Sequence, residues 1–199
     1  WQANHRDDYT ATDPKVGGHP AACASSLHLT TAMHMVARAP QDFWCGKPHM
    51  APLDHCLHHQ LGVFRTQDST WMNTADAEAL MSRLRQFSTV QSATFQSYHA
   101  SSDADSWRVL PSGTVGIPPV NSGYLALTHN YLVDRNLEDK KDVHFWSLLG
   151  DSEFREGSLF EAITDFGERR LGNVSWILDY NRQSLDGTRL INNDAFGGT

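Results

Sequence analysis

The fold is decided by Val143-His144-Phe145-Trp146-Ser147-Leu148-Leu149-Gly150-Asp151, a largely apolar run that ends at a glycine and an aspartate. Residues 158–171 follow with apolar side chains at helical spacing, and Gly172-Asn173 is a suitable end for that helix. Residues 174–178 form a second apolar run, which ends at Asp179-Tyr180-Asn181. A helix between two buried apolar runs is typical of a strand–helix–strand unit with parallel strands. We therefore predict an α/β fold with a parallel sheet flanked by helices, incomplete at its ends.

Helical spacing also occurs outside this unit. The expected helices cover residues 23–38, 51–61, 74–87 and 122–136. The first is rich in Ala, Leu and Met, so we expect it to be buried, and the last carries Leu125, Leu127, Tyr131 and Leu132. Residues 88–120 are rich in Ser, Gly and Pro and predict a long loop, stiffened by Pro118-Pro119. Loops of that length are often functional.

Composition narrows the possible functions. The net charge of -7 over 199 residues argues against a nucleic-acid-binding surface. Three cysteines do not make a disulfide framework, so a reducing cytoplasmic setting is expected. No apolar run approaches the roughly 20 residues that cross a bilayer, so we expect no membrane partner. The sequence starts at Trp1 rather than Met, and we expect a fragment or a processed chain.

Polar residues follow both predicted strands and suggest a metal site. Asp151, Asn181 and Gln183 offer hard oxygen atoms, which Mg²⁺ prefers, and the carboxyl ends of parallel strands meet at one sheet edge. Gly150 and Ser152 precede a helix whose free backbone N–H groups would attract phosphate. The alternative is that these residues only turn the chain, because Gly-Asp at a strand end and Asn or Gln in a loop are common.

The ordered motifs resemble one enzyme family. Gly150-Asp151-Ser152-Glu153, followed by Asp179-Tyr180-Asn181-Arg182-Gln183, resembles the thiamine-diphosphate (ThDP) signature of homodimeric-type pyruvate dehydrogenase E1 chains and transketolase-like enzymes. The resemblance implies a ThDP-binding fold. It implies that Asp151 and Asn181 bind Mg²⁺ through side chains and Gln183 through its backbone carbonyl. Gly150, Ser152 and Glu153 would join Asp151 and Asn181 around the cofactor.

Further motifs in the same order extend the resemblance. Lys15-Val16-Gly17-Gly18-His19 and Lys47-Pro48-His49 resemble segments that place two histidines at the active centre. Ser97-Tyr98 resembles a pair near the cofactor's phosphate end, so Tyr98 is expected to contact the cofactor. Residues 111–116 resemble the loop that contacts the aminopyrimidine, which implicates Val115 and Gly116. Ala22 and Lys47 depart from the pattern of pyruvate-specific chains.

The histidines have two interpretations each. His19 and His49 suit proton transfer near neutral pH, or they cap turns beside Gly or Pro. His55, His58 and His59, with Cys56, suggest a zinc cluster, but their spacing matches no closed four-ligand pattern. We therefore expect these three histidines to form the polar face of the 51–61 helix.

The resemblance implies a ThDP- and Mg²⁺-dependent subunit that decarboxylates a 2-oxo acid and transfers the acyl unit. Residues 1–199 would be a single diphosphate-binding domain. The pyrimidine-binding domain, which donates an activating glutamate, would be absent and supplied by another chain or a second subunit. A lipoyl or acyl carrier protein would be the acceptor. Two alternatives stay open: two-carbon ketol transfer, with Lys47 engaging a sugar phosphate, and a catalytically silent scaffold.

Overall fold

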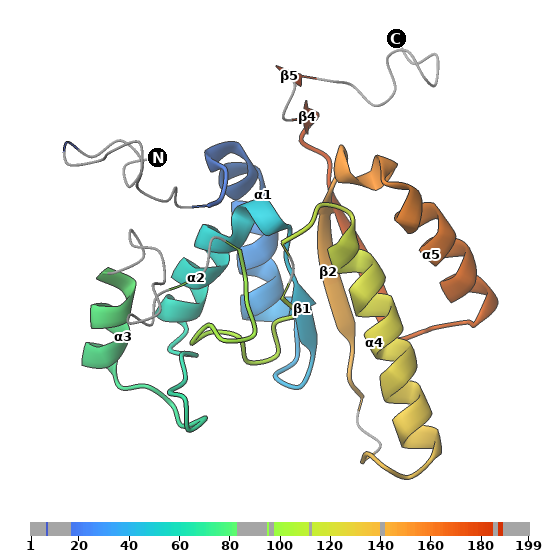
Figure 1. The fold of residues 1–199 in the computed structure, drawn as a ribbon, viewed down its shortest axis with the longest axis horizontal. Coiled ribbons are helices and arrows are strands. Elements are labelled where there is room, and N and C mark those ends of the chain that lie inside the picture. Colours follow the sequence, from blue (N-terminus) through green and yellow to red (C-terminus); the bar gives the residue numbers. More distant parts are fainter. Residues whose placement is uncertain are drawn as a thin grey trace. The chain divides into compact units, whose positions relative to one another are not determined.

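The chain divides into two compact units. The computed structural model describes residue 7 and residues 17–82, 95, 98–111, 113–139, 142–184 and 187–188 (Figure 1). The helical unit comprises Trp1–Arg38 and Pro48–Gly113, and the sheet unit comprises Ala39–Lys47 and Thr114–Thr199. The single domain expected over residues 1–199 stays a prediction.

The sheet unit is built on three parallel strands in the order β1-β2-β3. These are β1 (Phe43–Cys45), β2 (Phe145–Gly150) and β3 (Val174–Asp179). The register aligns Phe145 with Val174 at one end and Gly150 with Asp179 at the other. The two strands expected from the apolar runs are confirmed. The three-residue strand β1 is too short for its period to stand out in the sequence.

Two helices complete the sheet unit. Helix α4 (Ile117–Asp134) packs against all three strands, and α5 (Gly157–Glu168) links β2 to β3 and packs against α4 (Figure 1). The short 3₁₀ helix η4 (Glu153–Arg155) precedes α5. The predicted α/β fold, with a parallel sheet flanked by helices, is confirmed.

Helix α4 starts earlier than the sequence predicts. It begins at Ile117, directly after Gly116, so Pro118 and Pro119 lie in its first turn rather than in a loop. A proline is tolerated there because the first backbone N–H groups of a helix have no partner within it. The large apolar residues of this helix do not all face inward: Leu125 and Tyr131 are exposed, whereas Ser122, Gly123 and Ala126 are buried.

Small residues face inward on α4 because its neighbours approach closely. A Cβ atom added at Gly123 would lie 2.0 Å from the ring of Phe166 on α5. Phe166 is itself buried and also packs edge-on against Tyr124 and Trp176. Close helix packing therefore selects small side chains where spacing alone favours large ones.

Helix α5 ends earlier than the sequence predicts, since the sequence places the end at Gly172. The helix ends at Glu168, and Arg170 takes the left-handed conformation with φ 53°. The Leu171 N–H then donates to the Phe166 carbonyl at 3.1 Å, which is the bond of a Schellman motif. The expected contact face is confirmed at Leu159, Ala162 and Phe166, while Ile163 is exposed.

The helical unit contains α1 (Pro20–Ala32), the π-helical turn η2 (Met33–Ala37), the 3₁₀ helix η3 (Pro48–Met50), α2 (Ala51–Gln60) and α3 (Thr74–Ser82). The helices expected in these regions are confirmed. The expected burial of the first one is wrong for Leu27, Leu29, Met35 and Val36, which are exposed.

A small apolar core lies beside α3. It consists of Phe64, Ala77, Leu80 and Phe95. The expected α3 residues Leu84 and Phe87 lie outside the described residues. Among the helices of the described chain, none combines the length and hydropathy needed to cross a membrane.

The contact between Gly123 and Phe166 leaves no room for a larger side chain at position 123. Gly123→Ala should lower the free energy of unfolding by about 1–3 kcal/mol, because the added methyl group overlaps the Phe166 ring. Gly167→Ala in α5 is the matched control, since nothing lies within 4 Å of its added Cβ. Its stability should be unchanged or raised by up to about 1 kcal/mol through helix propensity. Urea denaturation followed by circular dichroism measures both; a Gly123 variant as stable as the control would contradict the packing.

Candidate metal and diphosphate site

Asp151 lies at the carboxyl end of β2 and is buried, with 1% of its surface exposed. Its backbone N–H donates to the Asp179 carbonyl at 3.3 Å, so it extends the ladder between β2 and β3. Its Oδ2 accepts a hydrogen bond from the Arg182 backbone N–H at 3.1 Å. Its Oδ1 is buried and has no hydrogen-bond partner among the described residues. A buried carboxylate oxygen of this kind fits a bound cation.

Asn181 and Gln183 follow β3 at the same edge of the sheet. Because Gly150 pairs with Asp179, the chain segments after the two strands begin side by side. Arg182 takes a left-handed conformation with φ 59°, which turns the chain between Asn181 and the short strand β4 (Gln183–Ser184). β4 pairs antiparallel with β5 (Gly187–Thr188). The predicted meeting of the two strand ends is confirmed, while the metal-binding roles of Asp151, Asn181 and Gln183 stay predictions.

Glu153 ties the strand end to the start of α4. Its Oε1 accepts from the Gly116 N–H at 2.7 Å, and its Oε2 accepts from the Gly150 N–H at 3.0 Å. Burial raises the pKa of Glu153 above its ordinary value, although these two backbone bonds oppose the shift. The sequence had suggested that the Gly150 N–H would be free to bind phosphate. It donates to Glu153 instead. An anion could use it only if Glu153 turned away.

Gly116 holds a conformation that suits glycine. Its φ is +86°, and an added Cβ would lie 2.6 Å from Cβ of Glu156. Val115, beside it, is 36% exposed. Ser152 accepts a hydrogen bond at its Oγ from Arg155 at 3.1 Å. Their predicted contacts with a cofactor stay predictions.

A buried ion pair lies beside these residues and was not predicted. Lys47 Nζ lies 2.5 Å from Asp179 Oδ2, and both side chains are 7% exposed. The pair joins residues 132 positions apart, so no local pattern could reveal it. Lys47 is thus bound to Asp179, and its engagement of a sugar phosphate stays an alternative. The ion pair lies at the edge of the sheet where Asp151 is found.

His19, His49 and Tyr98 all belong to the helical unit. The His19 backbone N–H donates to the His49 carbonyl at 2.8 Å, and the His49 ring meets Tyr98 edge-on at 5.6 Å between centroids. His19 Nδ1 also accepts from the Ala21 N–H at 3.2 Å and caps α1. The structure therefore brings these three residues together. His19 therefore caps α1, as the structural alternative predicted. The catalytic roles of His19 and His49 stay predictions.

The polar face expected for α2 is not exposed to solvent at two of its histidines. His55 and His58 are buried at 1% and 2% exposure, whereas His59 is partly exposed and Cys56 is exposed. The buried face of α2 also includes Asp54. Residues distant in sequence supply the partners of these side chains, so the spacing within α2 could not show that they are buried.

The sheet unit is thus an α/β domain with a polar site at the carboxyl edge of a parallel sheet. No protein-family profile matches the chain. The pyruvate dehydrogenase E1 component of Mycolicibacterium smegmatis is 30% identical over 176 residues, which cover 86% of this chain and 18% of that protein. The same-named proteins of Corynebacterium glutamicum and Mycobacterium tuberculosis are 27% and 29% identical over equal shares. The chain is therefore E1-like in sequence over most of its length, and it spans less than a fifth of these relatives.

Loss of one partner of the buried Lys47–Asp179 pair should cost more stability than loss of one partner of a surface pair. Lys47→Ala should lower the free energy of unfolding by about 3–5 kcal/mol, because Asp179 would stay buried without its partner. Arg169→Ala is the control: Arg169 pairs with Asp165 in α5, but its side chain is 50% exposed. Surface pairs contribute about 0–1 kcal/mol, so this variant should barely change stability. Equal losses in the two variants, measured by urea denaturation, would contradict the burial of the Lys47 pair.

Proposed function

We propose that this chain is the diphosphate- and Mg²⁺-binding part of a ThDP-dependent, E1-like enzyme that decarboxylates a 2-oxo acid and transfers the acyl unit. The relatives are named pyruvate dehydrogenase E1 component, which supports an enzyme of the 2-oxo acid dehydrogenase type. The chain has three cysteines, too few for a disulfide framework, which suits the reducing cytoplasm that we propose as its location.

The observation that carries the proposal is the state of Asp151. Its Oδ1 is buried with no partner among the described residues, and Asp151 lies at the carboxyl end of a parallel strand, beside the strand that leads to Asn181. Buried charges are normally paired or bound to a metal. In the proposal, the side chains of Asp151 and Asn181 and the backbone carbonyl of Gln183 hold Mg²⁺, and diphosphate oxygens complete its coordination.

The other predicted residues take supporting roles. ThDP supplies the carbanion-stabilising chemistry when bound, and the protein supplies position and electrostatics. Glu153 holds the Gly116 and Gly150 backbones together, so that Val115, Gly116 and Ser152 keep their places around the cofactor. Tyr98 is proposed to lie near its phosphate end.

His19 and His49 are proposed to move protons. Because Nδ1 of His19 accepts the Ala21 N–H, its neutral ring carries the proton on Nε2, which is the atom that would donate it. His49 contacts the Tyr98 ring, which limits its rotation. Imidazole side chains commonly serve as general acids and bases in such proton transfers.

The proposed enzyme needs more than this polypeptide. The glutamate that activates the aminopyrimidine is proposed to come from a pyrimidine-binding domain on another chain or second subunit. A lipoyl or acyl carrier protein is proposed to accept the acyl unit.

Binding of ThDP tests the proposed role of Asp151 in the Mg²⁺ site. Isothermal titration of ThDP into the chain with Mg²⁺ should show saturable binding, which Asp151→Asn should abolish by removing the metal's carboxylate. Asp134→Asn, at the exposed end of α4, should bind as the unmodified chain does. Equal binding by the Asp151 variant would refute its role. No binding by the unmodified chain, even with its partner, would favour the silent-scaffold alternative.

The proposed need for a partner predicts that the chain alone does not turn over substrate. The polypeptide alone, with ThDP, Mg²⁺ and pyruvate, should release no carbon dioxide above the rate without protein, because the activating glutamate is proposed to lie elsewhere. Release of carbon dioxide measures this directly. Sustained decarboxylation by the purified chain would contradict the need for a partner.

A further inference from the structure

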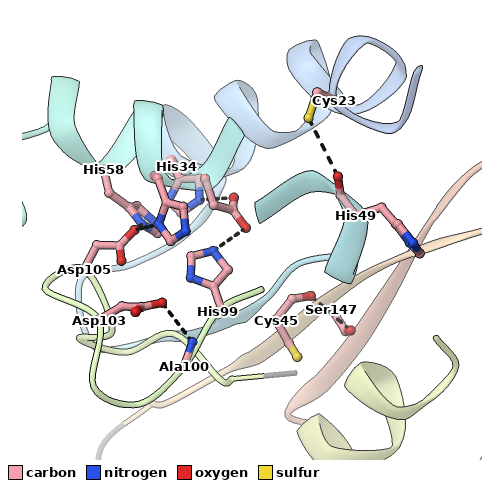
Figure 2. Close-up of polar contacts among 12 residues, drawn as sticks. Cys23, His34, Cys45, His49, His58, His99, Ala100, Asp103, Asp105 and Ser147 are labelled. Carbon is pink, nitrogen blue, oxygen red and sulfur yellow. Dashed lines mark hydrogen bonds and ion pairs between the residues drawn. The ribbon is translucent and has the colours of Figure 1, made fainter. Parts of the chain in front are cut away.

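A cluster of buried histidines and aspartates lies within the helical unit (Figure 2). Helix α2 contributes Asp54, His55 and His58, and η2 contributes His34. The irregular segment 98–111 contributes His99, Asp103 and Asp105. Figure 2 shows the rings of His34, His58 and His99 and the Asp105 carboxylate turned toward a common region beneath the helices. None of these residues belongs to the proposed cofactor site.

Four members of the cluster are arranged as metal ligands would be. His55, His99, Asp103 and Asp105 each offer one donor atom, and all four atoms lie within 4.8 Å of one another. All four residues are buried. Zinc ligands lie about 2.0–2.2 Å from the ion, so tetrahedral donors lie roughly 3.3–3.6 Å from one another. Side-chain movements of about 1 Å would close the widest of these separations.

Asp105 orients two imidazoles. Its Oδ2 lies 2.7 Å from His55 Nδ1 and 2.8 Å from His58 Nδ1. Oδ2 is therefore shared by the two rings. An ion bound between Asp105 and His55 would replace the hydrogen bond between them, while His58 would keep its bond to Asp105. Nε2 of both rings and Oδ1 of Asp105 have no partner among the described residues.

Asp54 orients His99 in the same way. Asp54 Oδ2 lies 3.2 Å from His99 Nε2, which leaves His99 Nδ1 buried without a partner in the described chain. A histidine that donates one N–H to a carboxylate and presents its other nitrogen is the usual arrangement of a metal-binding histidine. Asp103 accepts the Ala100 N–H at 2.9 Å, which holds its loop in a tight turn.

Protons alone satisfy this cluster poorly. His55 Nε2, His58 Nε2, His99 Nδ1 and Asp105 Oδ1 are all buried without a partner in the described chain. A proton added to one of these nitrogens makes an N–H group that again needs an acceptor. A cation between the side chains would instead bind several of these atoms at once.

We propose that His55, His99, Asp103 and Asp105 bind one transition-metal ion of the zinc class. Two imidazole nitrogens and two carboxylate oxygens suit tetrahedral Zn²⁺, and four buried protein ligands make a closed, structural site. The ion attaches the irregular segment 98–111 to α2. Asp54 and His58 support the ligands from outside the coordination shell.

Cobalt titration tests the proposal on the unmodified chain. The purified protein is first treated with a chelator, and Co²⁺ is then added while visible absorption is recorded. The expected result is saturation at one Co²⁺ per chain, with the intense bands of tetrahedral cobalt, and displacement by one equivalent of Zn²⁺. Absence of saturable binding overturns the proposal.

Two ligand variants locate the ion. His99→Gln and Asp103→Asn should weaken Co²⁺ binding by more than about tenfold. Asp103→Asn keeps an amide oxygen that can accept the Ala100 N–H, so it tests the site even if His99→Gln fails to fold. His28→Gln is the control, since His28 is exposed on α1. Unchanged affinity in a folded Asp103 variant overturns the proposed ligand set.

One further variant separates this site from the proposed Mg²⁺ site. Asp151→Asn should retain Co²⁺ binding with full affinity, and excess Mg²⁺ should not displace the bound Co²⁺, because the nitrogen ligands disfavour magnesium. Loss of the cobalt bands in Asp151→Asn would instead assign the bound metal to the sheet unit and refute the histidine site.

Discussion

The parallel pairing of β2 with β3 is the constraint on which the sheet unit depends. The register from Phe145–Val174 to Gly150–Asp179 brings the ends of both strands to one edge. The polar segments that follow must then share a small space. Asp151 is buried there because its backbone continues the ladder, so its charge is removed from water and needs a partner.

Charges at this edge are balanced by specific contacts rather than by solvent. Lys47 neutralises Asp179, and two backbone N–H groups stabilise Glu153. Asp151 keeps one oxygen without a partner among the described residues. Its neighbours Asp179 and Glu153 have partners, whereas this Asp151 oxygen has none in the described chain. That contrast supports the proposed Mg²⁺ site.

The helical unit places polar side chains where a helix normally buries apolar ones. The buried face of α2 presents Asp54, His55 and His58, while the described apolar core of this unit lies beside α3. Asp105 and His99 come from segment 98–111 and complete the cluster. Such a network is stabilising only when its atoms are paired, which gives the proposed metal a structural reason.

The sequence by itself determined the parallel strands, the helix between them and the position of Asp151 at a strand end, because period and turn residues act locally. Similarity to E1 components followed from ordered motifs. Tertiary structure alone decided the Lys47–Asp179 pair, the small inward face of α4 and the burial of His55 and His58. Each depends on partners far along the chain, such as Phe166 for Gly123 and Asp105 for His55. Contacts of that kind arise from packing geometry, which no local pattern of residues encodes.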